Sequence, residues 1–180
     1  PHFPFPNGEV AALVATSRLD AVEMIRHLRF SHLEYYKYLN CGYRLPLVGG
    51  TDKMSSDVPV GLYRTYVRFS EGQEFNYTNW CRNVALGRTF LSGGPIIDFK
   101  VEGHESGDTF LMNGPGTVNV TVRAESIIPI HTLELVQEGK VIMAEDSSNG
   151  QRVLEINFDV NISSNTWLSA RCGGPGYFSE

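Results

Sequence analysis

The sequence predicts a chain of two parts, an α/β half over residues 1–92 followed by an all-β half over residues 93–180. The charge balance changes between them: the first half holds ten Lys and Arg against eight Asp and Glu, the second five against twelve. Fourteen of the twenty aromatic residues also lie in the first half, whereas the second is rich in Val, Ile and Thr. We therefore expect a domain boundary near Gly93.

In the first half, helical and strand patterns alternate. A capping box at Ser31–Glu34 predicts the start of a helix that ends at Gly42, and Asn76 or Thr78 would cap a later helix. In order, the predicted elements are helix 9–17, strand 20–25, helix 31–42, strand 44–49, strand 62–69, helix 78–86 and strand 89–91. This βα order is typical of parallel sheets and of closed barrels, but about three strands are too few to close a barrel.

The second half reads as strands throughout. Apolar and polar residues alternate at 96–102, 108–112, 117–124, 132–137, 140–144, 152–160 and 166–171. The pair Glu138-Gly139 predicts a tight hairpin, and Trp167 is the expected core residue on a late strand. We predict an immunoglobulin-like β-sandwich over residues 93–180, lacking its last strand.

Composition narrows the function classes. The net charge of -5 and the absence of a basic patch argue against nucleic-acid binding, and no apolar run approaches the roughly 18 residues needed to cross a membrane.

Three widely spaced cysteines, Cys41, Cys81 and Cys172, fit neither a disulfide scaffold nor a Cys-x-x-Cys metal site, and we expect buried thiols. These features predict a soluble bacterial protein, cytoplasmic or exported. The chain begins without Met or signal peptide, so we expect a fragment of a longer protein.

The run from Leu47 to Met54 is the strongest candidate for a functional site. Its apolar residues lead into two glycines and then into Asp52 and Lys53. In a β/α barrel, catalytic groups lie at the carboxyl ends of the strands, where Asp52 would be a metal ligand or an acid. Asp and Gly are also ordinary turn residues, so a purely structural turn is the alternative.

Three motifs carry a family resemblance: Gly-Gly-Thr-Asp-Lys-Met at 49–54, Gly-Leu-Tyr-Arg-Thr-Tyr-Val at 61–67 and Gly-Arg-Thr-Phe-x-Ser-x-Gly-Pro at 87–95. Together they resemble the C-terminal part of PHP-superfamily metallohydrolases, the polymerase and histidinol phosphatase type. The resemblance is greatest to the branch of carbamate-ester hydrolases of the CehA/McbA type. It spans residues 1 to about 95 and weakens in the β-rich half.

This resemblance implies a fold and a metal site. The family fold is a distorted seven-stranded barrel, of which residues 1–92 would form the last units, and its enzymes use divalent transition metals such as Zn, Mn or Fe to activate water. Asp52 falls on the family's late Asp motif, and His2 is a second candidate ligand. Many members carry a His two residues after this Asp, where this chain has Met54, which removes one expected ligand. For His2, a place in a flexible terminal segment is the alternative.

Glu23 is the third candidate metal-site residue. It lies between Val22 and Met24 in a predicted buried strand, where a carboxylate needs a partner. It could bind metal, hold a metal-bound His, or form a salt bridge to Arg44 or Arg64, and the last two roles fit the residue pattern better.

Lys53 and Arg64 are further candidate catalytic residues. Together with Asp57 they surround the mouth of the site in the sequence and could orient an anionic or carbonyl substrate, although exposed loop charges are more often only solvated. The other histidines are predicted to be structural or exposed: His27, His32, His104 and His131. No nucleophile elbow, phosphate loop or nucleotide fingerprint is present in the sequence.

Two functions remain open. The favoured one is the C-terminal part of a metal-dependent hydrolase of phosphoester, carboxylic-ester or carbamate-ester bonds, inactive by itself, with a small-molecule ester as its substrate. The alternative is a noncatalytic β-sandwich module that binds carbohydrate or a partner domain. Uncovered barrel edges also predict a homo-oligomer.

Overall fold

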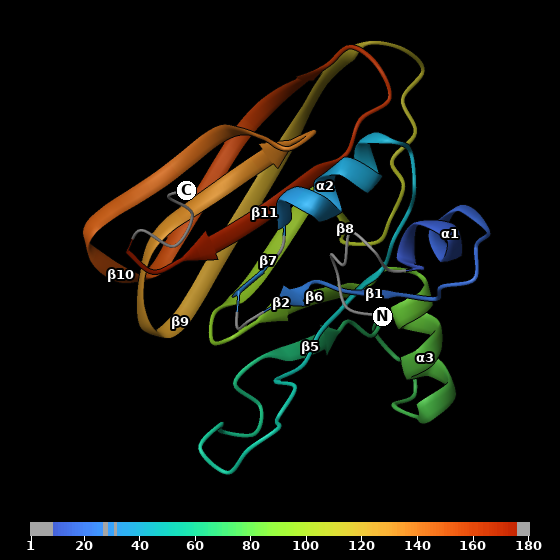
Figure 1. The fold of residues 1–180 in the computed structure, drawn as a ribbon. Helices are drawn as coiled ribbons and strands as arrows, with labels where there is room; N and C mark the ends of the chain where they lie inside the picture. The colour runs from blue at the N-terminus through green and yellow to red at the C-terminus, as the bar shows by residue number, and fades with distance from the viewer. Residues whose placement is uncertain (1–8, 27–28, 31, 176–180) are drawn as a thin grey trace. The chain divides into compact units, whose positions relative to one another are not determined.

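The computed structural model of the chain describes residues 9–26, 29–30 and 32–175, which form three helices and eleven strands (Figure 1). The fold is β-rich. It divides into two compact units. Unit 1 comprises Pro1–Gly93 with Ser106–Asp108, and unit 2 comprises Gly94–Glu105 with Thr109–Glu180.

Unit 1 contains all three helices and six short strands. The helices are α1 (Val10–Ala15), α2 (His32–Asn40) and α3 (Tyr77–Ala85); the strands are β1 (Val22–Glu23), β2 (Ile25–Arg26), β3 (Arg29–Phe30), β4 (Leu47–Val48), β5 (Arg64–Val67) and β6 (Thr89–Ser92). Strands β1 and β4 pair in parallel, whereas β2–β3 and β5–β6 pair antiparallel. The sequence predicted most of these elements near their observed positions, but the strands are shorter.

The predicted cap of α3 is confirmed. The Asn76 side chain accepts a hydrogen bond from the Asn79 backbone N–H at 2.9 Å, so one of the unpaired donors in the first turn is satisfied. The capping box predicted for α2 includes Ser31, which lies outside the described residues.

The core of unit 1 is small and centres on the fully buried Val22. Its buried apolar residues are Val10, Val14, Val22, Met24, Tyr35, Tyr36, Leu45 and Val84. The Tyr35 hydroxyl donates to the Leu45 carbonyl at 2.6 Å, and burial raises the pKa of Tyr35 well above its ordinary value. The neutral phenol is therefore the form that this core accommodates.

The segment Ser106–Asp108 returns to unit 1 through backbone contacts. The Arg44 guanidinium donates to the Gly107 carbonyl, and the Arg68 guanidinium lies 3.7 Å from the Asp108 carboxylate. Gly107 has a φ of 88°, and a Cβ there would lie 2.6 Å from the Leu86 carbonyl oxygen. Only glycine fits this approach of two backbones.

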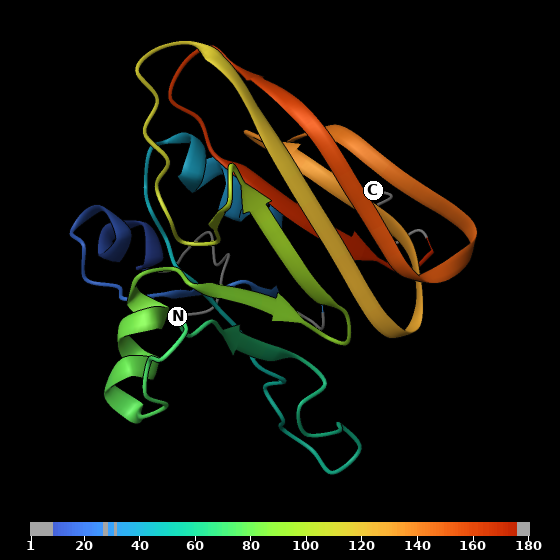
Figure 2. The same cartoon turned by 180° about the vertical axis from the view of Figure 1, so that it is seen from behind.

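Unit 2 is one hydrogen-bonded sheet of β7 (Ile96–Val101), β8 (His104–Glu105), β9 (Gly116–Gln137), β10 (Lys140–Ile162) and β11 (Leu168–Gly173). Strands β9 and β10 pair with each other along most of their length (Figures 1 and 2). In the first limb of β9, residues 116–125 pair with β10, and residues 120–125 of this limb also pair with β7 on the other side. In the second limb, residues 132–137 lie between β10 and β11.

Both limbs contribute to a single core. Val118, Val120, Val122 and Ala124 alternate with exposed residues in the first limb, as the sequence pattern predicted. They belong to one buried cluster with Ile130, Leu133 and Leu135 of the second limb and Leu154, Ile156 and Val160 of β10. The buried positions change from even to odd numbers where β9 bends, so one strand supplies side chains to the core from both limbs.

The hairpin predicted at Glu138-Gly139 is confirmed. Both residues have positive φ, 52° and 88°, the geometry that matches a two-residue turn to the twist of its strands. Register irregularities interrupt the β9–β10 ladder between Asp146 and Val153, next to the bend in β9. Bulges of this kind let long strands turn a corner without losing their pairing on either side.

Several details of the predicted β half differ from the structure. The segments 117–124 and 132–137 belong to one strand, as do 140–144 and 152–160, and residues 108–112 form no strand. Trp167, expected in the core, is half-exposed and lies just before β11, where its carbonyl accepts from the Glu138 N–H at 3.4 Å. The apolar residues of β9 and β10 fill the core instead.

The cysteines are less buried than predicted. Cys41 is exposed, whereas Cys81 and Cys172 are half-buried. Cys172 packs against the core of unit 2, and burial raises its pKa to about 11. Among the residues that the structure describes, no helix is long and apolar enough to cross a membrane.

Replacing Leu135 with Ala should destabilise unit 2 by about 2–5 kcal/mol, because the side chain is fully buried and its removal leaves a cavity. Leu111→Ala is the matched control, since Leu111 is 85% exposed and should change the stability by less than about 0.5 kcal/mol. Urea unfolding followed by Trp167 fluorescence in a Trp80→Phe background isolates unit 2. Equal effects of the two substitutions would contradict this core.

Candidate functional site

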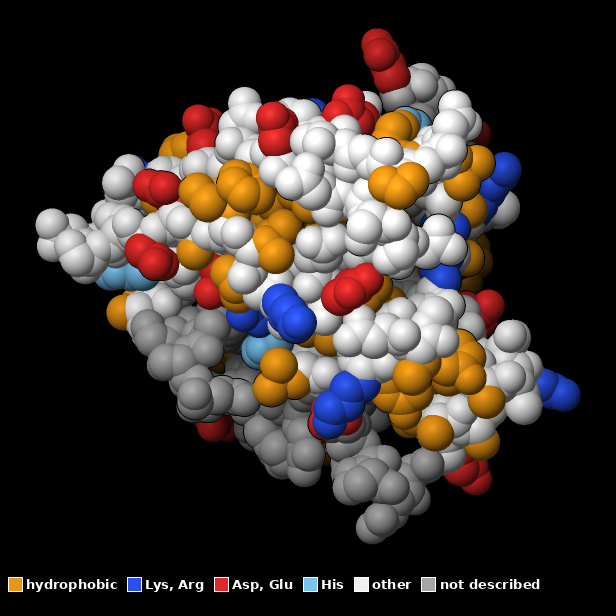
Figure 3. Space-filling model, turned by 90° about the horizontal axis from the view of Figure 1, so that it is seen from above, with side chains coloured by type: hydrophobic (Ala, Val, Ile, Leu, Met, Phe, Trp, Pro, Cys, Tyr) orange, Lys and Arg blue, Asp and Glu red, His pale blue; other side chains and the backbone are white. Residues whose placement is uncertain are grey.

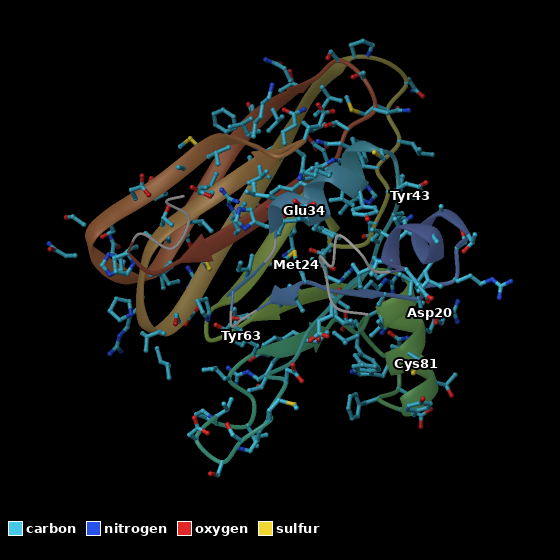
Figure 4. The ribbon with its side chains drawn as sticks, in the orientation of Figure 1. Asp20, Met24, Glu34, Tyr43, Tyr63 and Cys81 are labelled. Carbon is cyan, nitrogen blue, oxygen red and sulfur yellow. The ribbon has the colours of Figure 1, made fainter. Side chains whose placement is uncertain are left out.

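The candidate site is the loop that leaves β4 at Gly49 and returns at Tyr63, the residue before β5 (Figure 4). Because β1 and β4 are parallel, with Glu23 beside Val48, both strands end at the same edge. The loop that carries Asp52 starts from this edge. This is the arrangement in which side chains from different strand ends can converge.

A threonine of β5 fixes the first residue of the loop. The Thr65 hydroxyl donates to the Gly49 carbonyl at 2.7 Å and accepts from the Gly49 N–H at 2.8 Å. Both backbone groups of Gly49 are therefore satisfied by one side chain. Thr89 of β6 acts similarly on β4, because its hydroxyl donates to the Leu47 carbonyl at 2.7 Å.

The other end of the loop is held by Thr51. Its hydroxyl lies 3.3 Å from the Tyr63 carbonyl, to which it donates, and it accepts from the Tyr63 N–H at 3.2 Å. These contacts close the loop just before Asp52. The residues between Asp52 and Val60 extend away from this closure, and Met54 is 85% exposed.

Asp52 is exposed and has a φ of 48°. Asp and Asn are the non-glycine residues that most readily adopt this left-handed conformation, because their short polar side chains hydrogen-bond locally. The carboxylate is therefore presented to solvent from a residue whose backbone is constrained on its N-terminal side by Thr51.

Lys53, the second predicted catalytic residue, is used within the loop. Its ammonium donates to the Ser55 carbonyl at 2.7 Å and also to the Val58 carbonyl. Asp57 is exposed, and a hydrogen bond from the Ser55 side chain lowers its pKa below the ordinary value. The loop thus has its own hydrogen-bond network, which lies on the C-terminal side of Asp52 and centres on Ser55.

Arg64, the third predicted catalytic residue, begins β5 and is exposed. Its guanidinium carbon lies 5.7 Å from the centroid of the Tyr66 ring, and that ring stacks on Phe90 with centroids 4.7 Å apart. Tyr66 and Phe90 are register partners in the β5–β6 pair. Arg64 therefore covers an aromatic pair at a distance typical of a cation–π contact.

Glu23 is half-buried on β1, beside the fully buried Val22. Of the two arginines considered as its partners, Arg44 contacts Gly107 and Arg64 lies over Tyr66. His2, the remaining candidate ligand, lies outside the described residues.

The metal site implied by the sequence is not assembled by the described residues alone. Within residues 9–26, 29–30 and 32–175, no three side chains of His, Cys, Asp or Glu come together as a metal-binding group. A structural or catalytic transition-metal site usually takes at least three protein ligands. Asp52 and Glu23 could supply carboxylate oxygens, and any further ligands would come from elsewhere.

Comparison with known proteins gives no relative: no family model, no curated protein and no solved structure matches the chain. The geometry of the loop and the sequence motifs therefore carry the functional argument.

Sequence reasoning missed the threonines that hold this site. Thr51, Thr65 and Thr89 looked like ordinary residues of strands and turns, yet their hydroxyls satisfy backbone groups of Tyr63, Gly49 and Leu47, respectively. Their spacing in the sequence does not indicate which backbone they meet. The one signal in the sequence was that all three lie within the motifs at 49–54, 61–67 and 87–95.

Thr65→Val should destabilise unit 1 by about 1–3 kcal/mol, because the isosteric side chain leaves both backbone groups of Gly49 without their partner. Thr65→Ser keeps the hydroxyl and should cost clearly less. Urea unfolding followed by Trp80 fluorescence in a Trp167→Phe background reports on unit 1. Valine and serine variants of equal stability would show that the hydroxyl does not hold the loop.

Proposed function

We propose that the chain contributes to the active site of a metal-dependent hydrolase of the PHP type, which cleaves phosphoester, carboxylic-ester or carbamate-ester bonds. The observation that carries the proposal is the position of Asp52. It follows the end of β4, in a loop that opens at the same edge as the end of the parallel strand β1. The motif Gly-Gly-Thr-Asp-Lys-Met, on which the resemblance chiefly rests, forms this loop.

The role proposed for Asp52 is to bind a divalent transition metal. An exposed carboxylate on a hydrogen-bonded loop is a suitable oxygen donor, and when bound such a metal supplies an activated water molecule. Glu23 would assist as a ligand or as an acceptor for a ligand histidine. His2 and residues outside the described ranges would complete the set, since the described residues bring no three ligands together.

Lys53 and Arg64 have supporting roles in this proposal. The Lys53 ammonium donates to two carbonyls of its own loop, so it stabilises the loop that presents Asp52. Arg64 is exposed over Tyr66 and remains accessible to an anionic or carbonyl group of the ester substrate. The chain by itself is proposed to be inactive, because Asp52, Glu23 and His2 would need the further ligands that the N-terminal strands of the family's barrel supply.

The two units would then be barrel segments and an appended sandwich. In unit 1, the parallel pair β1–β4 and the βα order support a partial barrel. In unit 2, one limb pairs β7, β9 and β10, the other pairs β10, β9 and β11, and a shared core supports an immunoglobulin-like arrangement. Short strands with open edges in unit 1 also support association into a homo-oligomer.

A noncatalytic binding module is the second candidate function. The exposed surface of the β9–β10 pair supports it, because polar side chains there form hydrogen bonds across the two strands: Asn119 donates to Asn157 and Asp159, and Thr117 donates to Asn161. Such a surface could contact carbohydrate or a partner domain. This binding function would require no catalytic residue.

The proposal predicts a specific loss on substitution of Asp52. In the protein produced as its gene encodes it, Asp52→Asn should reduce bound Zn or Mn and the hydrolysis of a nitrophenyl phosphoester or aryl carbamate by at least about tenfold, because the amide is a much weaker ligand. Metal content by elemental analysis and turnover of both substrates are the measurements. Thermal unfolding should change little, since Asp52 is exposed.

Asp57→Asn is the matched control. Asp57 is an exposed aspartate of the same loop that hydrogen-bonds Ser55, so its substitution should leave metal content and turnover unchanged. Normal metal content and turnover in the Asp52→Asn protein would remove the residue on which the proposal rests. A wild-type protein that binds no metal and hydrolyses neither ester would favour the binding module.

A further inference from the structure

Strand β10 has one long edge that pairs with no other strand among the described residues. From Val153 to Ile162 it pairs with β9 in an unbroken register of ten residues, and β9 carries β7 on its other side. Among the strands that the structure describes, β10 pairs only with β9 and is the outermost strand of this limb. Ten extended residues span about 33 Å, enough for a partner strand of ordinary length.

The hydrogen bonds of Asn119 show which backbone groups face the open edge. The Asn119 N–H donates to the Glu102 carboxylate at 2.6 Å, and its carbonyl accepts from the Glu102 N–H at 3.0 Å. Both groups therefore point away from β10. Asn119 is the register partner of Asp159, and in an antiparallel pair the two partners direct their backbone groups either both toward or both away from each other. The backbone groups of Asp159 accordingly face the open edge.

Alternate residues along a strand share this orientation. The positions with outward N–H and C=O groups are Val153, Glu155, Asn157, Asp159 and Asn161. The residues between them turn their backbone toward β9 and their side chains into the core, where Leu154, Ile156 and Val160 are each 3% exposed. These buried side chains therefore fix which residues of β10 face outward at the edge.

This edge lacks several devices that usually prevent strand addition. Residues 153–162 contain no Pro, Gly or Lys, and the ladder irregularities all lie before this stretch. What it does carry is negative charge, from the exposed side chains of Glu155 and Asp159. Arg123 forms ion pairs with both Glu155 and Glu125, so its single positive charge does not neutralise these two carboxylates.

This charge selects between possible occupants of the edge. If a second copy paired antiparallel through its own β10, centred on Asn157, Glu155 of each chain would lie opposite Asp159 of the other. Like charges directly opposite each other destabilise a strand pair. A strand with Lys or Arg at these positions would gain two opposite-charge pairs instead. Residues 93–180 carry twelve acidic residues against five basic ones, so their overall charge also favours a basic partner.

We propose that the open edge of β10 between Val153 and Ile162 binds an extended basic segment of a partner protein, which adds as a further antiparallel strand. Backbone hydrogen bonds to the five outward positions provide the affinity. Pairing of lysines or arginines with Glu155 and Asp159 sets the register and excludes a second copy. This function is independent of the hydrolase site in unit 1.

Amide hydrogen exchange on the full chain tests the open edge directly. In the free protein the amides of residues 154, 156, 158 and 160 should exchange slowly, and those of 153, 155, 157, 159 and 161 should exchange fast. An acetylated and amidated nonapeptide of alternating lysine and valine should slow the second set and leave the first set unchanged. Slow exchange of both sets in the free monomer would overturn the proposal, because the edge would already be covered.

Variants identify the contacts. Asn157→Pro removes an outward N–H without breaking the β9 ladder, and it should abolish binding of the fluorescent-labelled peptide measured by anisotropy. Glu155→Gln with Asp159→Asn should keep the fold and weaken binding about threefold to tenfold at low salt. The peptide controls are the same sequence with a central proline and a glutamate–valine peptide, neither of which should bind.

Three results would contradict the proposal even if the proline variant does not fold. They are equal binding of the glutamate–valine peptide, unchanged binding to the Glu155→Gln, Asp159→Asn protein, and protection that appears with rising protein concentration together with a dimer in sedimentation. The last would identify a second copy as the occupant. Loss of hydrolase activity in the Asp52→Asn protein has no bearing on these outcomes.

Discussion

The pairing of β9 with β10 is the constraint on which unit 2 depends. A two-residue turn at Glu138-Gly139, with both φ values positive, sets the register of the two longest strands in the chain. A slip of one residue in β9 would move Val118, Val120 and Val122 to the solvent face while their partners on β10 kept facing the core. The turn, the alternation and the core therefore require one another.

The bend in this hairpin lets each of its two strands contribute two paired segments to the same core. Near Gly150 the ladder is irregular, and a Cβ on this glycine would lie 2.6 Å from the Pro129 side chain. The close approach allows the limbs on either side to share Ile130, Leu133 and Leu135 with the first-limb valines in one cluster. Figure 3 shows that apolar side chains, drawn in orange, also reach the surface among the charged ones. The exposed apolar residues of unit 2 include Ile127 and Ile128, which are 88% and 56% exposed.

The sequence was most informative where one local rule decides the outcome. Asn76 caps α3 because its side chain accepts a hydrogen bond from the first turn. The Glu138-Gly139 pair indicated a hairpin turn because such turns need positive φ, which glycine readily adopts. The alternation at 117–124 and 152–160 placed the core of unit 2 correctly. The sequence could not show that these strands continue through a bend, because a bulge changes the alternation and resembles a loop in a single sequence.

Sequence reasoning was weaker for the site and for Trp167. Aromatic residues are usually buried, but whether Trp167 fills the core depends on where β11 starts relative to the turn, which is a tertiary feature. In the candidate site, the motif around Asp52 indicated which loop to consider as a site. It did not indicate that Thr65 and Thr51 would hold this loop, since hydroxyl-to-backbone contacts over 12 to 16 residues leave no periodic pattern.

Asp52 differs from the carboxylates of unit 2, and this difference bears on the proposed function. In unit 2, Glu134 forms a part-buried ion pair with Arg171, and Glu155 and Asp159 bind Arg123 and Asn119, so these acids support strand pairing. Asp52 is exposed, and at a φ of 48° a glycine would relieve the backbone of its remaining strain. Neither burial nor backbone conformation therefore requires a carboxylate there. The metal-binding role proposed for Asp52 would use its charge, and this is the physical reason for proposing the site on this loop.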